Sequence, residues 1–126
     1  MGLDNHENWK EVISKEDFHL ILHQFLNKKN ESEKSLETLE TISEKYTKFY
    51  ENILTKEEVE SINVLLIKFT DFGNLNRMET LTALLFNFKI NEYYDYLLKH
   101  YFTIINQKVK KEISDTLSEY KSLMNK

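Results

Sequence analysis

Residues that break a helix are nearly missing from this chain. Its 126 residues include two glycines, no proline and no cysteine, and one of the glycines, Gly2, stands at the N-terminus. Tight turns, phosphate-binding loops and strained nucleophile elbows depend on glycine, and proline ends or kinks helices. Long helices joined by short polar connections suit this composition better. The sequence therefore predicts an all-α fold.

The length and the apolar content predict a single helical domain over residues 1–126. Hydrophobic residues make up 40% of the chain and aromatic residues 13%, which is enough to build a buried core. No apolar run approaches the ~20 residues that a membrane span needs, and the polar N-terminus does not look like a signal peptide. Without a disulfide framework, the cytoplasm is the expected compartment, with no membrane contact.

Apolar residues recur every three or four positions in five segments, which predicts a bundle of five helices. A short segment, residues 1–13, is expected to precede them. The last helix is predicted to be the longest. The five predicted segments are 18–26, 36–53, 59–69, 78–90 and 91–126.

Polar residues at the ends of these segments predict where the helices begin and end. Ser14 and Asn76 are placed to cap the first and fourth helices. Thr55 and Glu58 form a capping box, in which the threonine hydroxyl and the glutamate carboxylate each accept a backbone N–H. Gly73 is placed for a left-handed C-cap after the third helix.

The predicted fourth helix is apolar around almost its whole circumference, as expected of a core helix. Val64 and Ile67 lie opposite the main apolar stripe of the third helix, which predicts that this helix is contacted from two directions. The third and fourth helices should therefore be central. The residues expected to be buried in the fourth are Leu81, Leu84, Leu85 and Phe88.

The last helix changes its apolar face near Lys108. The stripe after this point is rotated by roughly 120° from the stripe before it, at 100° per residue. Either the helix bends there, or residues 109–126 form a protruding helical extension. An exposed stripe on such an extension would need a cover, so we expect a second copy of the chain or a partner protein to bind it. The stripe consists of Val109, Ile113, Leu117, Tyr120 and Met124.

A group of aromatic residues in the last predicted helix is a second candidate surface for a partner, because tyrosine is favoured in interfaces. The group consists of Tyr93, Tyr94, Tyr96, Tyr101 and Phe102. Tyr93 and Tyr96 are the candidate partner-binding residues of this group. Core packing of Tyr94 and Tyr101, with partial exposure of the others, is the alternative.

His19 and His23 lie four residues apart on the first predicted helix, the spacing at which two imidazoles can share a metal ion. A di-iron bundle needs Glu-x-x-His on two helices, and only Glu16 with His19 makes that motif. The zincin motif is also missing, because Leu20 stands where its glutamate would be. We therefore expect these histidines to be structural and the chain to hold no metal.

Motifs for catalysis are also missing. The chain has no cysteine, no Gly-x-Ser-x-Gly sequence and no glycine-rich phosphate loop. We expect a protein that is not an enzyme, with no catalytic residues and no cofactor.

Direct DNA binding is the main alternative to protein binding. Residues 76–101 have the order helix, short turn, helix, and Lys108, Lys110 and Lys111 form a basic cluster. However, the would-be recognition helix starts with Glu92 and Asp95 near its N-terminus, where contacts to DNA are expected to be basic or neutral. Arg77 is the only arginine of the chain, and the net charge is −4. Nucleic acid is therefore not the expected partner.

Three stretches between Tyr46 and Ile105 resemble a small helical family of unknown function from Gram-positive bacteria. They are Phe49-Tyr50 leading into Leu54–Glu58, Met78–Leu81 with Ala83-Leu84, and Tyr93-Tyr94. The resemblance implies a compact helical fold, and it supplies no activity.

Small size, many lysines and few arginines or alanines suggest a gene of a phage, a plasmid or a low-GC bacterium. We expect an intracellular protein-binding module that acts through a helical surface, as a regulator, an inhibitor or an immunity-type protein. The alternative is a DNA-associated transcriptional regulator. The partner is expected to be another protein or a second copy of the chain.

Overall fold

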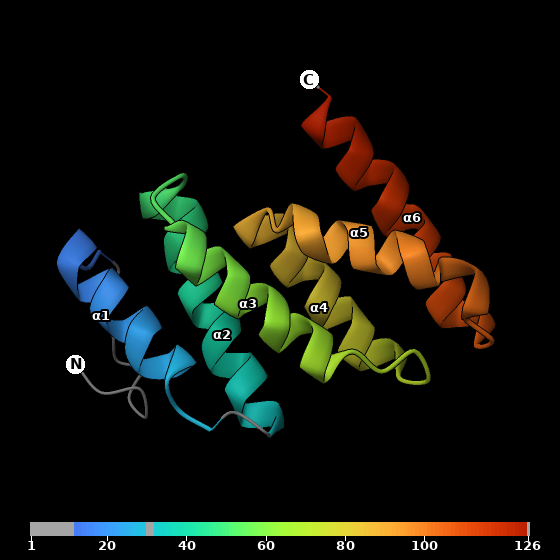
Figure 1. Cartoon of the computed structure of the whole chain (residues 1–126), viewed down its shortest axis with the longest axis horizontal. Helices are drawn as coiled ribbons and strands as arrows, with labels where there is room; N and C mark the ends of the chain where they lie inside the picture. Colours follow the sequence, from blue (N-terminus) through green and yellow to red (C-terminus); the bar gives the residue numbers. More distant parts are fainter. Residues whose placement is uncertain (1–11, 30–31, 126) are drawn as a thin grey trace. The chain divides into compact units, whose positions relative to one another are not determined.

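The computed structural model describes residues 12–29 and 32–125, so residues 1–11 of the expected N-terminal segment lie outside the description. The described part contains six α-helices and no strand, which confirms the all-α prediction. The predicted count of five helices is wrong by one. The α-helices are α1 (Lys15–Leu26), α2 (Glu33–Lys45), α3 (Lys56–Phe69), α4 (Leu75–Phe88), α5 (Asn91–His100) and α6 (Gln107–Met124), with a π-helix η2 (Tyr46–Tyr50) and a 3-10 helix η3 (Tyr101–Thr103) (Figure 1).

Contacts divide the chain into two compact units, Met1–Ile62 and Asn63–Lys126. Helix α3 begins in the first unit and ends in the second. Within the described residues no helix is long and apolar enough to cross a membrane.

The first unit is built on the apolar face of α1, which contacts α2. Ser14 caps α1 as predicted, because its hydroxyl accepts the N–H of Asp17 at 3.0 Å. The ring of Phe18 packs against the rings of Tyr46 and Tyr50. The buried residues of α1 are Phe18, Ile21, Leu22 and Phe25.

The second predicted helix, 36–53, does not continue to its expected end. Its last turn widens into the π-helix η2, which ends at Tyr50. Two residues later, Asn52 has a φ of 74°, in the left-handed region. The Asn52 N–H donates a 2.8 Å hydrogen bond to the Tyr46 hydroxyl. The Tyr46 hydroxyl thus accepts a backbone N–H that would bond to a carbonyl of the preceding turn if the helix continued.

Thr55 and Glu58 form the predicted capping box at the start of α3. The Thr55 N–H donates to Glu58 Oε1 at 2.8 Å, and the Glu58 N–H donates to the Thr55 hydroxyl at 3.1 Å. Val64, further along α3, is 66% exposed, so the prediction of a contact from a second direction is wrong for this residue, whereas Ile67 is half-buried.

The connection from α3 to α4 differs from the prediction at both ends. No glycine of the described residues has a positive φ, so Gly73 is not a left-handed cap. The side chain of Asp71 instead accepts the Gly73 N–H at 3.0 Å and closes the turn. Asn74, rather than Asn76, caps α4 by accepting the Arg77 N–H at 3.0 Å.

The second unit is organised around α4, which contacts both α5 and α6 (Figure 1). Its predicted core residues, Leu81, Leu84, Leu85 and Phe88, are all at most 2% exposed, which confirms the prediction. The helix ends at Lys89, whose φ of 57° is left-handed and whose N–H donates to the Leu85 carbonyl at 2.8 Å.

The predicted last helix, 91–126, is two helices in the structure. Helix α5 tightens into η3, and the chain is then non-helical from Ile104 to Asn106. Asn106 caps α6 by accepting the Val109 N–H at 3.1 Å. This break, and not a bend near Lys108, turns the second apolar stripe toward the core.

Candidate functional site

Two features of the described residues stand out from the ordinary surface. One is an apolar and basic segment around the α5–α6 connection, in the second unit. The other is a histidine and carboxylate cluster in the first unit.

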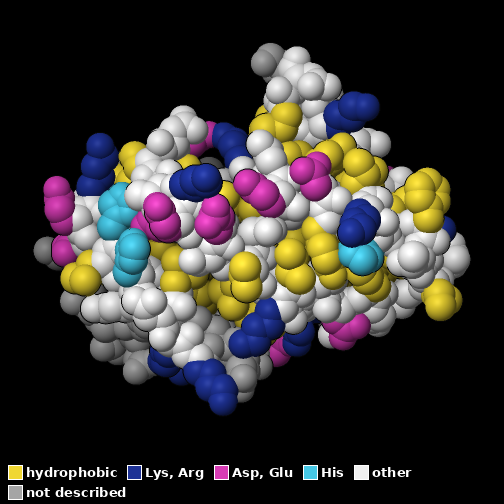
Figure 2. All heavy atoms as spheres, viewed as in Figure 1, with side chains coloured by type: hydrophobic (Ala, Val, Ile, Leu, Met, Phe, Trp, Pro, Cys, Tyr) yellow, Lys and Arg dark blue, Asp and Glu magenta, His cyan; other side chains and the backbone are white. Residues whose placement is uncertain are grey.

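The α5–α6 connection projects large apolar side chains into solvent. Leu98 is 48% exposed, Phe102 82% and Ile105 88%. Ile104 between them is only 4% exposed, so it anchors the connection while its neighbours point outward. Figure 2 shows hydrophobic side chains at this edge of the molecule, over the α5–α6 connection. Three large exposed apolar residues within eight positions are more than the scattered ones usual on a protein surface.

Local structure explains why Phe102 and Ile105 point outward. The 3-10 helix η3 and the following extended residues rotate each side chain differently from an α-helix. The Thr103 hydroxyl donates to the His100 carbonyl at 2.7 Å, and the capping Asn106 starts α6 immediately afterwards. Hydrogen bonds thus fix both ends of the connection.

The charged side chains within this stretch of sequence are all basic. Residues 96–111 contain Lys99, Lys108, Lys110 and Lys111 and no aspartate or glutamate. Lys99 and Lys108 are exposed, and the ammonium of Lys110 lies 5.2 Å from the centre of the Tyr101 ring. Lys111 is paired with Asp115 at 2.9 Å. We call residues 98–111 the basic apolar segment.

A shallow hollow of about 400 Å³ adjoins this segment. Its wall is formed by the α3–α4 turn and the α5–α6 connection, both in the second unit. The lining residues are Phe72, Gly73, Thr103, Ile104, Ile105 and Asn106. It offers room for a side chain next to the exposed Ile105.

The structure places most of the predicted partner-binding residues in the core. Tyr93, Val109 and Ile113 are fully buried, and Tyr120 is 1% exposed. Leu117 is half-buried, and so is Tyr96, whose ring centre lies 4.4 Å from that of His100. The prediction of an uncovered stripe on residues 109–126 is therefore wrong, because α4 and α5 of the same chain contact α6. Only Met124, 40% exposed, remains as predicted on the surface.

Sequence reasoning missed Ile105 because it assigned this residue to a continuous helix. Two signals were present. Asn106 precedes a regular apolar repeat and can cap it, and residues 96–111 lack acids altogether.

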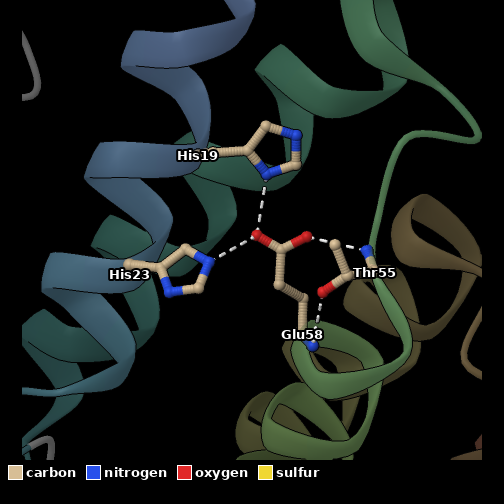
Figure 3. A network of polar contacts seen from close by, with 4 residues as sticks. All are labelled: His19, His23, Thr55 and Glu58. Atoms are coloured by element: carbon tan, nitrogen blue, oxygen red, sulfur yellow. Dashed lines mark hydrogen bonds and ion pairs between the residues drawn. The ribbon is translucent and has the colours of Figure 1, made fainter.

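The second feature joins His19 and His23 of α1 to Glu58 of α3, as Figure 3 shows. His19 Nδ1 lies 2.8 Å and His23 Nε2 3.0 Å from the same oxygen, Glu58 Oε2. The other oxygen, Oε1, accepts the Thr55 N–H. The Glu58 side chain is fully buried, whereas those of His19 and His23 are 31% and 55% exposed. Figure 2 shows histidine side chains together at the surface over α1.

The charge state of Glu58 follows from these partners. Burial by itself would raise the pKa of Glu58. The Thr55 N–H, the hydrogen bond from His19 and the positive charge that both imidazoles can carry together outweigh burial and lower this pKa. Glu58 is therefore an anion at neutral pH.

Comparisons of the chain with protein-family models, with curated proteins and with solved structures found no match.

Proposed function

We propose that this protein is a non-enzymatic protein-binding module that docks a partner on the basic apolar segment, residues 98–111. The observation that carries the proposal is the exposure of Phe102 and Ile105 within a segment that has four lysines and no acid. Large apolar side chains surrounded by polar ones are typical of the centre of a protein interface.

The charge of the segment defines the chemistry of the partner. A protein surface that offers apolar side chains next to aspartate or glutamate would cover Phe102 and Ile105 and pair with Lys99 and Lys108. Charge complementarity of this kind speeds association and selects partners. The net charge of −4 disfavours polyanions in general, so an acidic partner also needs the apolar contacts with Phe102 and Ile105, which DNA does not offer through its phosphates. A regulator, an inhibitor or an immunity-type protein would work in this way.

Affinity capture with paired variants tests the proposal. The wild type, a Phe102→Asp/Ile105→Asp double variant and a Val64→Asp control serve as baits in a lysate of the native host. Val64 is also exposed and apolar, but it lies in α3 outside the segment. A partner that is retained by the control and lost with the double variant supports the proposal, provided that the purified partner then binds the wild type.

Salt and competing ligands distinguish the alternatives. Lys99→Glu and Lys108→Glu should slow association with the purified partner and reduce its salt dependence. Sequence-dependent binding of duplex DNA with a steep salt slope would instead favour the DNA-associated regulator. Binding of anionic lipid vesicles through Phe102, with no protein partner, would contradict the proposal.

A further inference from the structure

We propose that His19, His23 and Glu58 form a binding site for one divalent transition-metal ion of the zinc type. The sequence alone argued against a metal, because Glu-x-x-His occurs only once and the zincin motif is missing. The structure adds a third donor from a different helix, 39 positions from His19 along the chain.

The three donors lie close together, and both imidazoles face one carboxylate oxygen. Both imidazole nitrogens approach the same carboxylate oxygen, at 2.8 and 3.0 Å, and the three candidate ligand atoms all lie within 4.8 Å of one another. In a tetrahedral zinc site with ligand bonds of 2.0–2.1 Å, the ligand atoms are about 3.3 Å apart. An ion would therefore need the two imidazoles to retreat from Glu58 Oε2 by a few tenths of an ångström. It would also need their two ligand nitrogens to approach each other by up to about 1.5 Å.

The ligand set suits the proposed class of metal. Two imidazole nitrogens and one carboxylate oxygen are the donors of many zinc sites, whereas calcium and magnesium prefer oxygen ligands alone. Either ring nitrogen of a histidine can bind a metal, so His19 through Nδ1 and His23 through Nε2 are both suitable.

The surroundings of the cluster hold the carboxylate in place for an ion. Glu58 Oε1 is occupied by the Thr55 N–H of the capping box, which leaves Oε2 facing the imidazoles (Figure 3). A hydrogen bond to the second oxygen of a ligating carboxylate is the usual outer support of a metal site. The exposure of His19 and His23 gives an ion a path from solvent and leaves room for water as a further ligand.

The consequence for the protein is a cross-link within Met1–Ile62. An ion bound by these residues would join the middle of α1 to the first turn of α3. Because the ion would bind the folded unit and not the unfolded chain, it would raise the stability of the fold.

The test is titration of the full chain, freed of metal with a chelator, with Zn²⁺ alone. Calorimetry should show one Zn²⁺ per chain, and thermal unfolding should shift to higher temperature with Zn²⁺ and return with chelator. Co²⁺ should give the visible absorption of a tetrahedral ion. Mg²⁺ should not compete, and equal affinity for Mg²⁺ would contradict ligation by imidazole.

Variants assign the site. His23→Ala and Glu58→Gln should each weaken Zn²⁺ binding at least tenfold, and His100→Ala, a histidine of the other unit, should leave it unchanged. Glutamine also serves in a capping box, so Glu58→Gln keeps the start of α3. His23 is half-exposed, and in His23→Ala the Glu58 carboxylate keeps its contacts with His19 and the Thr55 N–H, so the variant is expected to fold. A wild type that binds no Zn²⁺, or binding that is equal in His23→Ala, would overturn the proposal.

Discussion

The hydroxyl of Tyr120 in α6 donates a 2.6 Å hydrogen bond to the side-chain oxygen of Asn91, the first residue of α5. The Tyr120 ring is also stacked on Tyr94, with ring centres 5.2 Å apart. This pair joins the two helices that the sequence predicted to be one. It also makes part of the second unit sensitive to alkaline pH.

Stability should fall between about pH 10 and pH 12 in part because of Tyr120. Its burial, and then the negative charges of Glu92 and Asp95, raise the pKa of Tyr120 to about 12. A group whose pKa is raised by folding stabilises the folded state below its ordinary pKa, near 10, and loses that contribution as pH rises through the folded value. Burial raises the pKa of Tyr93 as well, although its 2.7 Å hydrogen bond with Thr70 acts in the opposite direction.

Tyr120→Phe provides the measurement. At pH 7 the variant should lose about 1 kcal/mol, because the Asn91 acceptor is left without its donor. Between pH 10 and pH 12 its stability should fall less steeply than that of the wild type in urea denaturation. Lysine titration is common to both proteins, so equal slopes would contradict the role of Tyr120.

Leu85→Ala should cost roughly 2–5 kcal/mol of unfolding free energy, because it empties a fully buried position of the central helix α4. Leu20→Ala is the matched control. Leu20 lies on α1 and is 55% exposed, so its truncation should change stability by less than about 0.5 kcal/mol. Chemical denaturation of both variants checks this contrast, and similar losses would place α4 outside the core.

Thr55→Ala should destabilise the protein by about 1 kcal/mol, because the capping N–H of Glu58 loses its acceptor. Ser32→Ala is the control, since Ser32 stands at the N-cap of α2 but makes no capping hydrogen bond there. We expect no measurable change in the control by thermal or urea unfolding. A loss in the control as large as in Thr55→Ala would show that the bond is not the cause.

Lys89→Gly should stabilise the protein by up to about 1 kcal/mol. Lys89 is left-handed, with φ 57°, and glycine adopts this conformation without the steric cost of a Cβ atom. Lys99→Gly, which places a glycine within α5, should instead destabilise the protein by up to about 1 kcal/mol. Urea denaturation gives the midpoint of each variant relative to the wild type. Shifts of both midpoints in the same direction would contradict the conformational argument.

Removal of residues 109–126 should unfold the second unit, because Val109, Ile113 and Tyr120 are at most 1% exposed. A shorter truncation, 122–126, removes only exposed positions of the described chain and should be tolerated. Circular dichroism and proteolysis of the two truncated chains check the difference. A folded chain that ends at residue 108 would restore the idea of a protruding extension.

Features that depend on a few neighbouring residues could be predicted from the sequence. The capping box of Thr55 and Glu58 and the buried face of α4 are of this kind, because each is determined within a few turns of one helix. The cap at Asn74 was missed in favour of Asn76, since both asparagines precede the same apolar repeat. The break between α5 and α6 was missed because Tyr101 and Ile105 are four residues apart, so the apolar pattern is the same for a continuous helix as for two helices.

The candidate sites depend on contacts between distant residues, and this is why the sequence revealed them only in part. His19 and His23 were recognised by their spacing, but nothing near them in sequence indicates Glu58. Phe102 stood in the predicted aromatic group, whereas the exposure of Ile105 depends on how η3 ends. Lys89 and Asn52 take left-handed conformations because the surrounding fold requires them there, and for Lys89 the residue type gives no hint of it.

The π-helix η2 also bears on how this chain can change over evolution. A π turn closes around one residue more than an α turn, so η2 is equivalent to one residue inserted into a regular helix. A lineage could lose a residue within Tyr46–Tyr50 and regain an ordinary α-helix there. The same deletion inside Leu36–Ile42 would rotate the following side chains by about 100° and turn buried ones outward. Among distant relatives, gaps of one residue should therefore fall at η2.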